Sequence, residues 1–295
     1  MDISIKPGKY VLAVSGGIDS MVLLDLLKDQ PQLKLIIAHY DHGIRPDSQQ
    51  DRQYVQVVAS NYGLPFVFEE GKLGLNTNEA TARMARYEFL ERTRQTHGAG
   101  AIITAHHQDD VLETAIINIL RGTGRKGLTA LANRSLVMRP LLNVPKADIQ
   151  TYAKNHQLQW REDSTNYDDK YLRNYVRKYW LTKFDSSARQ SLIDIIERMQ
   201  GINRELDIQL INLMHLQPGL NELDRGWLIS LPHQVAKEFL ASWLRTRGVE
   251  SYDTKTLERL VVGAKIMHSG SLIDISGGLS LDVRKDRLAL VGLER

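Results

Sequence analysis

A short glycine-rich segment near the start of the chain has the residue types needed to hold a phosphate. Residues 15–20 read Ser-Gly-Gly-Ile-Asp-Ser, between the apolar run 10–14 and the apolar-periodic run 21–27. This order predicts a strand, a tight turn and a helix. The glycines let backbone N–H groups turn toward one point at a helix N-terminus, where an anion is stabilised. The two serine hydroxyls add donors, and the carboxylate of Asp19 could hold Mg²⁺ between phosphate oxygens.

The same six residues also have a simpler interpretation, which is a strand-to-helix turn with a capping serine. They are not a Walker A motif, because no Gly-Lys-Ser or Gly-Lys-Thr follows them. As a complete hexapeptide behind an N-terminal strand, the segment resembles the pyrophosphate loop of the N-type ATP pyrophosphatases. That resemblance implies that ATP binds here, is cleaved between its α and β phosphates, and adenylates a carbonyl oxygen.

A second group of polar residues lies at the start of a predicted helix that ends near residue 120. His106, Asp110 and Glu113 are spaced by four and three residues, so they project from one face of that helix. Three interpretations are open: a transition-metal site, acids that complement the helix dipole, or a site beside the glycine loop. In the third, Asp110 holds Mg²⁺ or a substrate amine and His106 contacts a phosphate.

Strands alternate with helices over the first half of the chain. This alternation predicts an α/β fold, a doubly wound and mostly parallel five-stranded sheet with helices on both faces. Ligands bind at the carboxyl ends of the strands in such sheets, where His39 and Asp41 are expected. The predicted strands cover residues 10–14, 33–38, 65–68, 101–104 and 136–138, and the helices cover 21–27, 47–62, 78–97 and 105–120.

From about residue 187 the apolar residues recur at helical spacing instead. We therefore expect two domains, residues 1–186 and residues 187–295, joined by a long helix. The second domain is predicted to be smaller and mainly helical, with a terminal β-hairpin and one more strand. Its later helices are predicted over residues 232–247 and 253–262, and its strands over 271–291.

Composition and charge narrow the class of protein. The 295 residues include no apolar run long enough to span a membrane and begin without a signal-peptide pattern, so we expect a cytoplasmic protein. The chain has no cysteine, which excludes disulfides, thiolate nucleophiles and cysteine-ligated metal clusters. Residues 121–185 carry 13 Lys and Arg against 6 Asp and Glu, which fits either a nucleic-acid contact or a solvated basic face.

Taken together, the motifs of this chain resemble those of the tRNA(Ile)-lysidine synthetases. The resemblance covers about residues 10–180, and the tail around 273–279 is similar to the first C-terminal substrate-binding domain of that family. Longer members carry a further C-terminal domain, so the resemblance is to a short form. The matching stretches are residues 15–20, 40–45, 85–90, 104–114, 121–124, 139–142, 162–166 and 173–177.

The resemblance implies an ATP-dependent ligase that acts on the wobble cytidine in the CAU anticodon of tRNA(Ile). The C2 carbonyl oxygen of the cytidine would be adenylated, and the ε-amine of free L-lysine would then displace AMP to give lysidine. This change converts codon reading from AUG to AUA. ATP and Mg²⁺ are the implied cofactors. The sequence does not determine the oligomeric state, and a homodimer is one option.

The resemblance and the residue types also imply roles for individual side chains. Catalysis is expected from Asp19, Arg86, His106 and Asp110. ATP is expected to contact Ser15, Gly16, Gly17, Ile18, Asp19, Ser20 and His39, and Mg²⁺ to bind Asp19 and Asp110. Lysine is expected near Asp41, Asp110 and Glu113. The tRNA backbone is expected at Arg121, Arg125, Lys126, Arg161, Arg173, Arg177 and Lys178, with Tyr171, Tyr175 and Tyr179 as candidates for base stacking.

Other functions compete with this one. Enzymes of tRNA thiolation use the same fold and loop, but they rely on cysteines that this chain lacks. Glutamine-dependent synthetases of the superfamily need a glutaminase nucleophile or domain, and neither is present. A catalytically silent RNA-binding module is an alternative of a different class. The intact Asp19, His106 and Asp110 argue against it.

Overall fold

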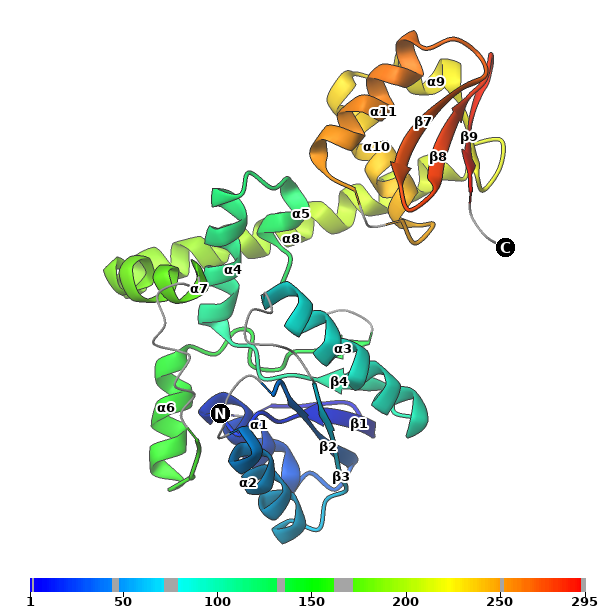
Figure 1. Cartoon of the computed structure of the whole chain (residues 1–295). Helices are drawn as coiled ribbons and strands as arrows, with labels where there is room; N and C mark the ends of the chain where they lie inside the picture. The colour runs from blue at the N-terminus through cyan, green and yellow to red at the C-terminus, as the bar shows by residue number, and fades with distance from the viewer. Residues whose placement is uncertain are drawn as a thin grey trace. The chain divides into compact units, whose positions relative to one another are not determined.

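The structure is a computed structural model, which describes residues 1, 3–43, 48–71, 79–131, 136–161, 172–249 and 252–292. The chain separates into two compact units, Met1–Met199 and Gln200–Arg295 (Figure 1). No helix in the described part of the chain is both long and apolar enough to cross a membrane.

A five-stranded parallel sheet forms the centre of the N-terminal unit. Its strand order is β3-β2-β1-β4-β5, and every neighbouring pair is parallel. The predicted fold class is therefore confirmed for this unit. The strands are β1 (Gly8–Ala13), β2 (Leu33–Asp41), β3 (Phe66–Glu70), β4 (Ala101–Ile103) and β5 (Val137–Met138).

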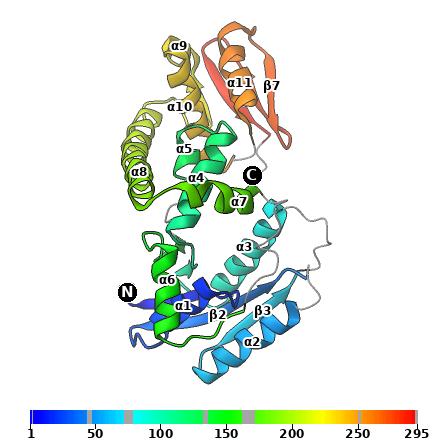
Figure 2. The ribbon, with the colours of Figure 1, turned by 90° about the vertical axis from the view of Figure 1, so that its left-hand side faces the viewer.

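Helices cover both faces of this sheet, as Figure 2 shows. Successive side chains of β1 point to opposite faces, so that Leu12 belongs to the core with α1, α2 and α6, whereas Val11 belongs to the core with α3. Both side chains are completely buried. The four helices are α1 (Ile18–Lys28), α2 (Ser48–Asn61), α3 (Glu79–Thr96) and α6 (Lys146–Asn155).

A third apolar core forms around α4 rather than against the sheet. Leu112 and Ile116 of α4 pack with Val176 and with Ile193 and Ile196 of the long helix. The first half of that helix thus belongs to the N-terminal unit, which is why the units divide inside it and not at the expected residue 186. The elements of this region are α4 (Gln108–Leu120), α5 (Arg125–Leu128), α7 (Leu172–Tyr175), the π-helix η2 (Val176–Trp180), the 3₁₀-helix η3 (Leu181–Lys183) and α8 (Ser186–Met214).

The C-terminal unit packs helices against an antiparallel sheet with strand order β6-β9-β8-β7. Phe239 and Trp243 are completely buried in its core. The predicted hairpin and third strand are present, and a short strand that the sequence pattern did not reveal pairs with the last one. The elements are β6 (Glu222–Asp224), α9 (Arg225–Ser230), α10 (His233–Arg245), α11 (Thr254–Ile266), β7 (Ser271–Ser276), β8 (Leu279–Val283) and β9 (Arg287–Val291).

Candidate functional site

The glycine loop joins β1 to α1 and is ordered by a serine at each end. The hydroxyl of Ser20 donates to the carbonyl oxygen of Gly17 at 2.8 Å and accepts the backbone N–H groups of Ser15 and Gly16, each at 3.2 Å. Gly16 has a φ of +92°, which a side chain would strain. The loop therefore delivers the N-terminus of α1 to the carboxyl edge of the sheet, where the positive end of the helix dipole favours an anion.

A cavity of about 420 Å³ lies in front of this loop. Because β1 pairs with both β2 and β4, the segments that follow these three strands meet at one edge and line it. Ring atom Nδ1 of His39 lies 2.9 Å from the carbonyl oxygen of Val14, so it carries the proton and donates. The predicted residues on the wall are Ser15, Gly17, Asp19, Ser20, His39, Asp41, Arg86, His106 and Asp110, together with Tyr40, His42, Ser48, Asp51 and Thr104, to which the sequence analysis gave no role.

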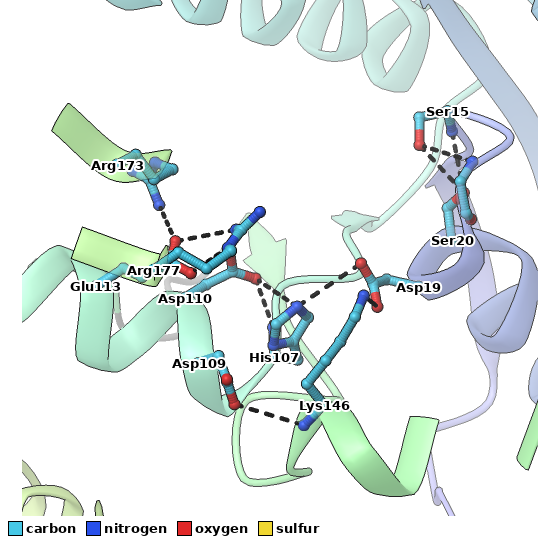
Figure 3. Close-up of polar contacts among 11 residues, drawn as sticks. Ser15, Asp19, Ser20, His107, Asp109, Asp110, Glu113, Lys146, Arg173 and Arg177 are labelled. Carbon is cyan, nitrogen blue, oxygen red and sulfur yellow. Dashed lines mark hydrogen bonds and ion pairs between the residues drawn. The ribbon is translucent and has the colours of Figure 1, made fainter. Parts of the chain in front are cut away.

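Two of the predicted acids lie on either side of a histidine that the sequence analysis did not single out. Nε2 of His107 is 3.6 Å from Oδ2 of Asp19 and 3.5 Å from Oδ2 of Asp110 (Figure 3). The backbone N–H of His107 also donates to Oδ2 of Asp110 at 2.9 Å, which caps the start of α4. His107 is 4% exposed, so these contacts are sheltered from water. In the sequence, only the three-residue spacing between His107 and Asp110 indicates that the two side chains lie close together.

His106 lines the cavity, whereas His107 does not. Burial, together with the charges of Arg86, Arg83 and Arg139, lowers the pKa of His106 to about 3, against the opposing charge of Asp110. Nδ1 lies 2.8 Å from the hydroxyl oxygen of Thr104, which fixes the ring orientation. Burial opposes the ionisation of Asp110, but its interactions with His107, with the backbone N–H of that residue and with Arg177 keep its pKa below the ordinary value.

The cavity wall also carries a positive charge. Arg86 lines it from α3, and its buried Nε atom has no hydrogen-bond partner among the described residues. Burial and the neighbouring Arg83 and Arg173 lower the pKa of Arg86. The hydroxyl of Tyr87 accepts from Arg83 at 3.4 Å and from Arg139 at 3.5 Å. An anionic group in the cavity would be attracted to this side.

The structure differs from the prediction for Glu113. Its side chain is completely buried and does not lie on the cavity wall. Its two carboxylate oxygens accept from Nε and a terminal nitrogen of Arg177 at 2.6 and 3.0 Å, and Arg173 lies 3.4 Å away. Burial disfavours the charged guanidinium of Arg177, but the pairing with Glu113 outweighs this and raises the pKa of Arg177. Glu113 thus positions two arginines that were predicted to contact tRNA, because α4 and η2 pack face to face.

The remaining predicted residues lie in different surroundings. Arg161 bonds to Asp51 at 2.5 Å, and its backbone N–H donates to the carbonyl oxygen of Gly16 at 3.0 Å, so it braces the glycine loop. Arg121 and Lys178 are exposed, whereas Arg125 and Lys126 are half-buried. Residues 44–45 and 162–166 of the matching motifs, and Tyr171, lie outside the described residues.

Asp19 and Asp110 offer hard oxygen donors to Mg²⁺, but too few to enclose it. No group of three or more His, Asp or Glu side chains in the described residues could hold a metal ion by itself. Mg²⁺ is commonly held by one or two carboxylates while phosphate oxygens and water complete the octahedron. Asp19 and Asp110 fit this shared coordination of Mg²⁺. They do not fit a metal centre that is enclosed by protein ligands alone.

Comparison with known proteins identifies the family. Residues 3–183 match the model of the PP-loop domain. A tRNA(Ile)-lysidine synthase of Nostoc sp. is 36% identical over 79% of this chain and 68% of its own length. The chain belongs to the tRNA(Ile)-lysidine synthase family of PP-loop proteins. The synthase of Caldanaerobacter subterraneus is also 36% identical, and one from Thermotoga maritima is 41% identical, over 68% and 59% of this chain.

This member spans about half the length of several curated lysidine synthases. The match covers 46% of the Caldanaerobacter protein and 44% of the Thermotoga protein. Among solved structures, a U34-tRNA thiolase from Methanococcus maripaludis, determined with its iron–sulfur cluster, has a TM-score of 0.55 and 21% identity. The match covers 66% of this chain and 73% of that one, and it shows a shared fold.

The depressed pKa of His106 predicts a pH-dependent stability. Between pH 6.5 and about 3 the unfolded chain binds a proton at this residue that the folded chain does not, so its contribution is full above pH 6.5 and is lost as the pH falls. As the pH falls from 7 to 5, we expect the free energy of unfolding to decrease by about 2 kcal/mol more in the wild type than in His106→Gln. Urea unfolding at the two pH values measures this, and equal losses would contradict it.

The buried ion pair predicts a second effect on stability. Arg177→Ala leaves the carboxylate of Glu113 buried without its bidentate partner, which costs about 3–5 kcal/mol for an enclosed pair. The side chain of Arg177 is 41% exposed, so we expect a loss at the low end of that range. Glu113→Gln in the same chain should recover part of it. Lys178→Ala, on the neighbouring exposed residue, is the control, and an equal loss there would refute the assignment.

Proposed function

We propose that this protein is an ATP-dependent ligase that joins L-lysine to C2 of the wobble cytidine in the CAU anticodon of tRNA(Ile), giving lysidine. One observation carries the proposal: a single cavity gathers the glycine loop, Asp19, Asp110, Arg86 and His106. The family to which the chain belongs, and the activity for which its relatives are named, support the identity of the substrates.

In the first half-reaction the C2 carbonyl oxygen of cytidine attacks the α-phosphorus of ATP, and pyrophosphate leaves. The N-terminus of α1 and the loop hydroxyls would hold the phosphates. The unpartnered Nε of Arg86 would be available to the negative charge that develops at the α-phosphate, and single preorganised donors of this kind contribute roughly 3–4 kcal/mol. Asp19 and Asp110 would hold Mg²⁺, which neutralises phosphate charge when it is bound.

His106 would act in that step as a neutral hydrogen-bond donor. With a pKa of about 3 it carries no charge near neutral pH. If the hydroxyl of Thr104 donates to Nδ1, the proton of the ring lies on Nε2, which is then the donor available to a phosphate oxygen. A charged imidazolium is not required, because Arg86 already supplies positive charge on the same wall.

In the second half-reaction the ε-amine of lysine attacks C2, and AMP leaves with the former C2 oxygen. The amine must lose one proton on the way, so a carboxylate must meet it. Asp41 and Asp110 are the acids that we place at this step, since Asp51 is bonded to Arg161. Oδ1 of Asp41 accepts the backbone N–H of Gly43 at 2.8 Å, which fixes its direction. Glu113 contributes by positioning Arg177 rather than by contacting lysine.

An exposed surface beside the site supports the proposed tRNA contact. Tyr175 and Tyr179 are 46% and 40% exposed, and their ring centroids lie 4.9 Å apart. The ammonium of Lys178 lies 5.0 Å from the ring of Tyr179. Aromatic rings interleaved with cations can stack on unpaired bases and neutralise phosphate together.

Thiolation of tRNA is the second candidate, because the thiolase from Methanococcus maripaludis shares the fold. This chain has no cysteine to carry sulfur or to ligate a cluster. Lysidine formation therefore accounts better for the residues that are present.

Incubation of a tRNA(Ile) transcript bearing CAU with ATP and isotope-labelled lysine tests the proposal. We expect mass spectrometry of the digested nucleosides to show a labelled cytidine derivative. Asp19→Ala should abolish it, because this carboxylate is proposed to hold the magnesium, while tRNA affinity stays within a few fold. Asp29→Ala, at the exposed end of α1, is the matched control and should be active. A fully active Asp19→Ala protein would contradict the mechanism.

A further inference from the structure

The carboxylate of Asp19 already has a cation beside it, and this cation comes from a distant part of the chain. The ammonium of Lys146 pairs with Oδ1 of Asp19, 127 residues away (Figure 3). Each side chain is 29% exposed. The other oxygen of Asp19 is the one that faces His107. A positive charge thus lies at the acid that we propose holds Mg²⁺.

Lys146 is an unfavourable residue for its place in the helix. It is the first residue of α6, where the positive end of the helix dipole disfavours a cation. The packing of α6 does not need the side chain of Lys146, because Ile149 and Ala153 of this helix are completely buried and supply that packing. The side chain therefore carries a local cost that its contact with Asp19 must offset.

The start of α6 is held firmly enough to aim this side chain. The backbone N–H of Lys146 points at Oδ1 of Asp109 at 3.5 Å, and Oδ2 of Asp109 is bonded to Arg189 at 2.9 Å. The backbone N–H of Gln108 donates to the carbonyl oxygen of Val144 at 3.1 Å. The turn before α6 is thus fastened to the first turn of α4, the helix that carries Asp110.

We infer that Lys146 is the internal counter-cation of the phosphate loop. It neutralises Asp19 when no metal is present and competes with Mg²⁺ for that carboxylate. Without a cation, a carboxylate on the wall would repel a triphosphate. A lysine ammonium suits this exchange, because it is a point charge on a flexible stem. The inference rests on the proposed binding of ATP at this loop.

A purely structural tie between α6 and α1 is the competing explanation. That tie exists without Lys146, since Tyr152 donates to Asp25 at 2.9 Å and the two helices share one core. Ion pairs that are partly exposed add little to stability. A structural role would weaken nucleotide binding equally with and without metal. If Lys146 is a counter-cation, its loss weakens nucleotide binding more without metal than with it.

The test is the dissociation constant of α,β-methylene ATP, measured by calorimetry once in EDTA and once at saturating Mg²⁺. The dissociation constant in EDTA divided by the constant in Mg²⁺ reports how much binding depends on the metal. We expect Lys146→Met to raise this ratio about tenfold, because the uncompensated carboxylate of Asp19 then repels the triphosphate in EDTA, whereas bound Mg²⁺ neutralises that carboxylate with or without Lys146. Lys146→Arg should keep the wild-type ratio. Lys154→Met, on an exposed residue of the same helix, is the control and should also keep it.

An unchanged ratio in folded Lys146→Met, with both constants weakened alike, would overturn the inference while leaving the proposed ATP site intact. Lys146→Gln is measured in parallel, so that a folding defect of one variant does not decide the outcome. If the wild type binds the analogue under neither condition, the proposed function fails as well. The two failures are therefore distinguishable.

Discussion

The parallel pairing of β1 with both of its neighbours is the constraint on which the site depends. The register that joins Ala13 to Ala38 and Leu12 to Ile103 brings the carboxyl ends of β1, β2 and β4 to one edge of the sheet. Each of these strands is buried on both faces, so a one-residue slip would exchange the side chains of the two apolar cores and disrupt the packing of both. The glycine loop, His39, Asp41 and the first turn of α4 are consequently held around one cavity although they come from three separate segments.

The wall of that cavity carries both acidic and basic side chains. Acids at Asp19, Asp41 and Asp110 lie on the same wall as Arg86, and each acid has a fixed partner in a backbone N–H, a histidine or a lysine. For Asp110, such partners keep the pKa of the carboxyl below its ordinary value although burial opposes this. Such a wall can accept a triphosphate, a divalent cation and an amine, provided that the partners exchange as each one binds.

The sequence predicted the local parts of this design well. The strand, glycine turn and helix around Ser15 follow from neighbouring residues, and so does the alternation that gives a parallel sheet. The end of β2 was placed too early, at Ala38, because the polar residues His39 to Asp41 read as a loop. In the structure they continue the ladder with Phe68 to Glu70.

The contacts between distant segments could not be predicted from spacing. Glu113 is 64 residues from Arg177, and nothing in either segment indicates that α4 and η2 pack together and bury the pair. The start of α6 at Lys146 follows Pro145, a common beginning of a helix, but its approach to Asp19 depends on Leu141 and Ile149 being buried in the sheet core. The three-residue strand β6 is defined mainly by its partner β9. Periodicity within a segment cannot reveal such pairings.

The most direct measurement of the central claim is a crystal structure of this protein with α,β-methylene ATP and magnesium. We expect the triphosphate to lie against residues 15–20 and the N-terminus of α1, with its α-phosphate facing Arg86. A nucleotide bound in another cleft, with this loop left empty, would contradict it.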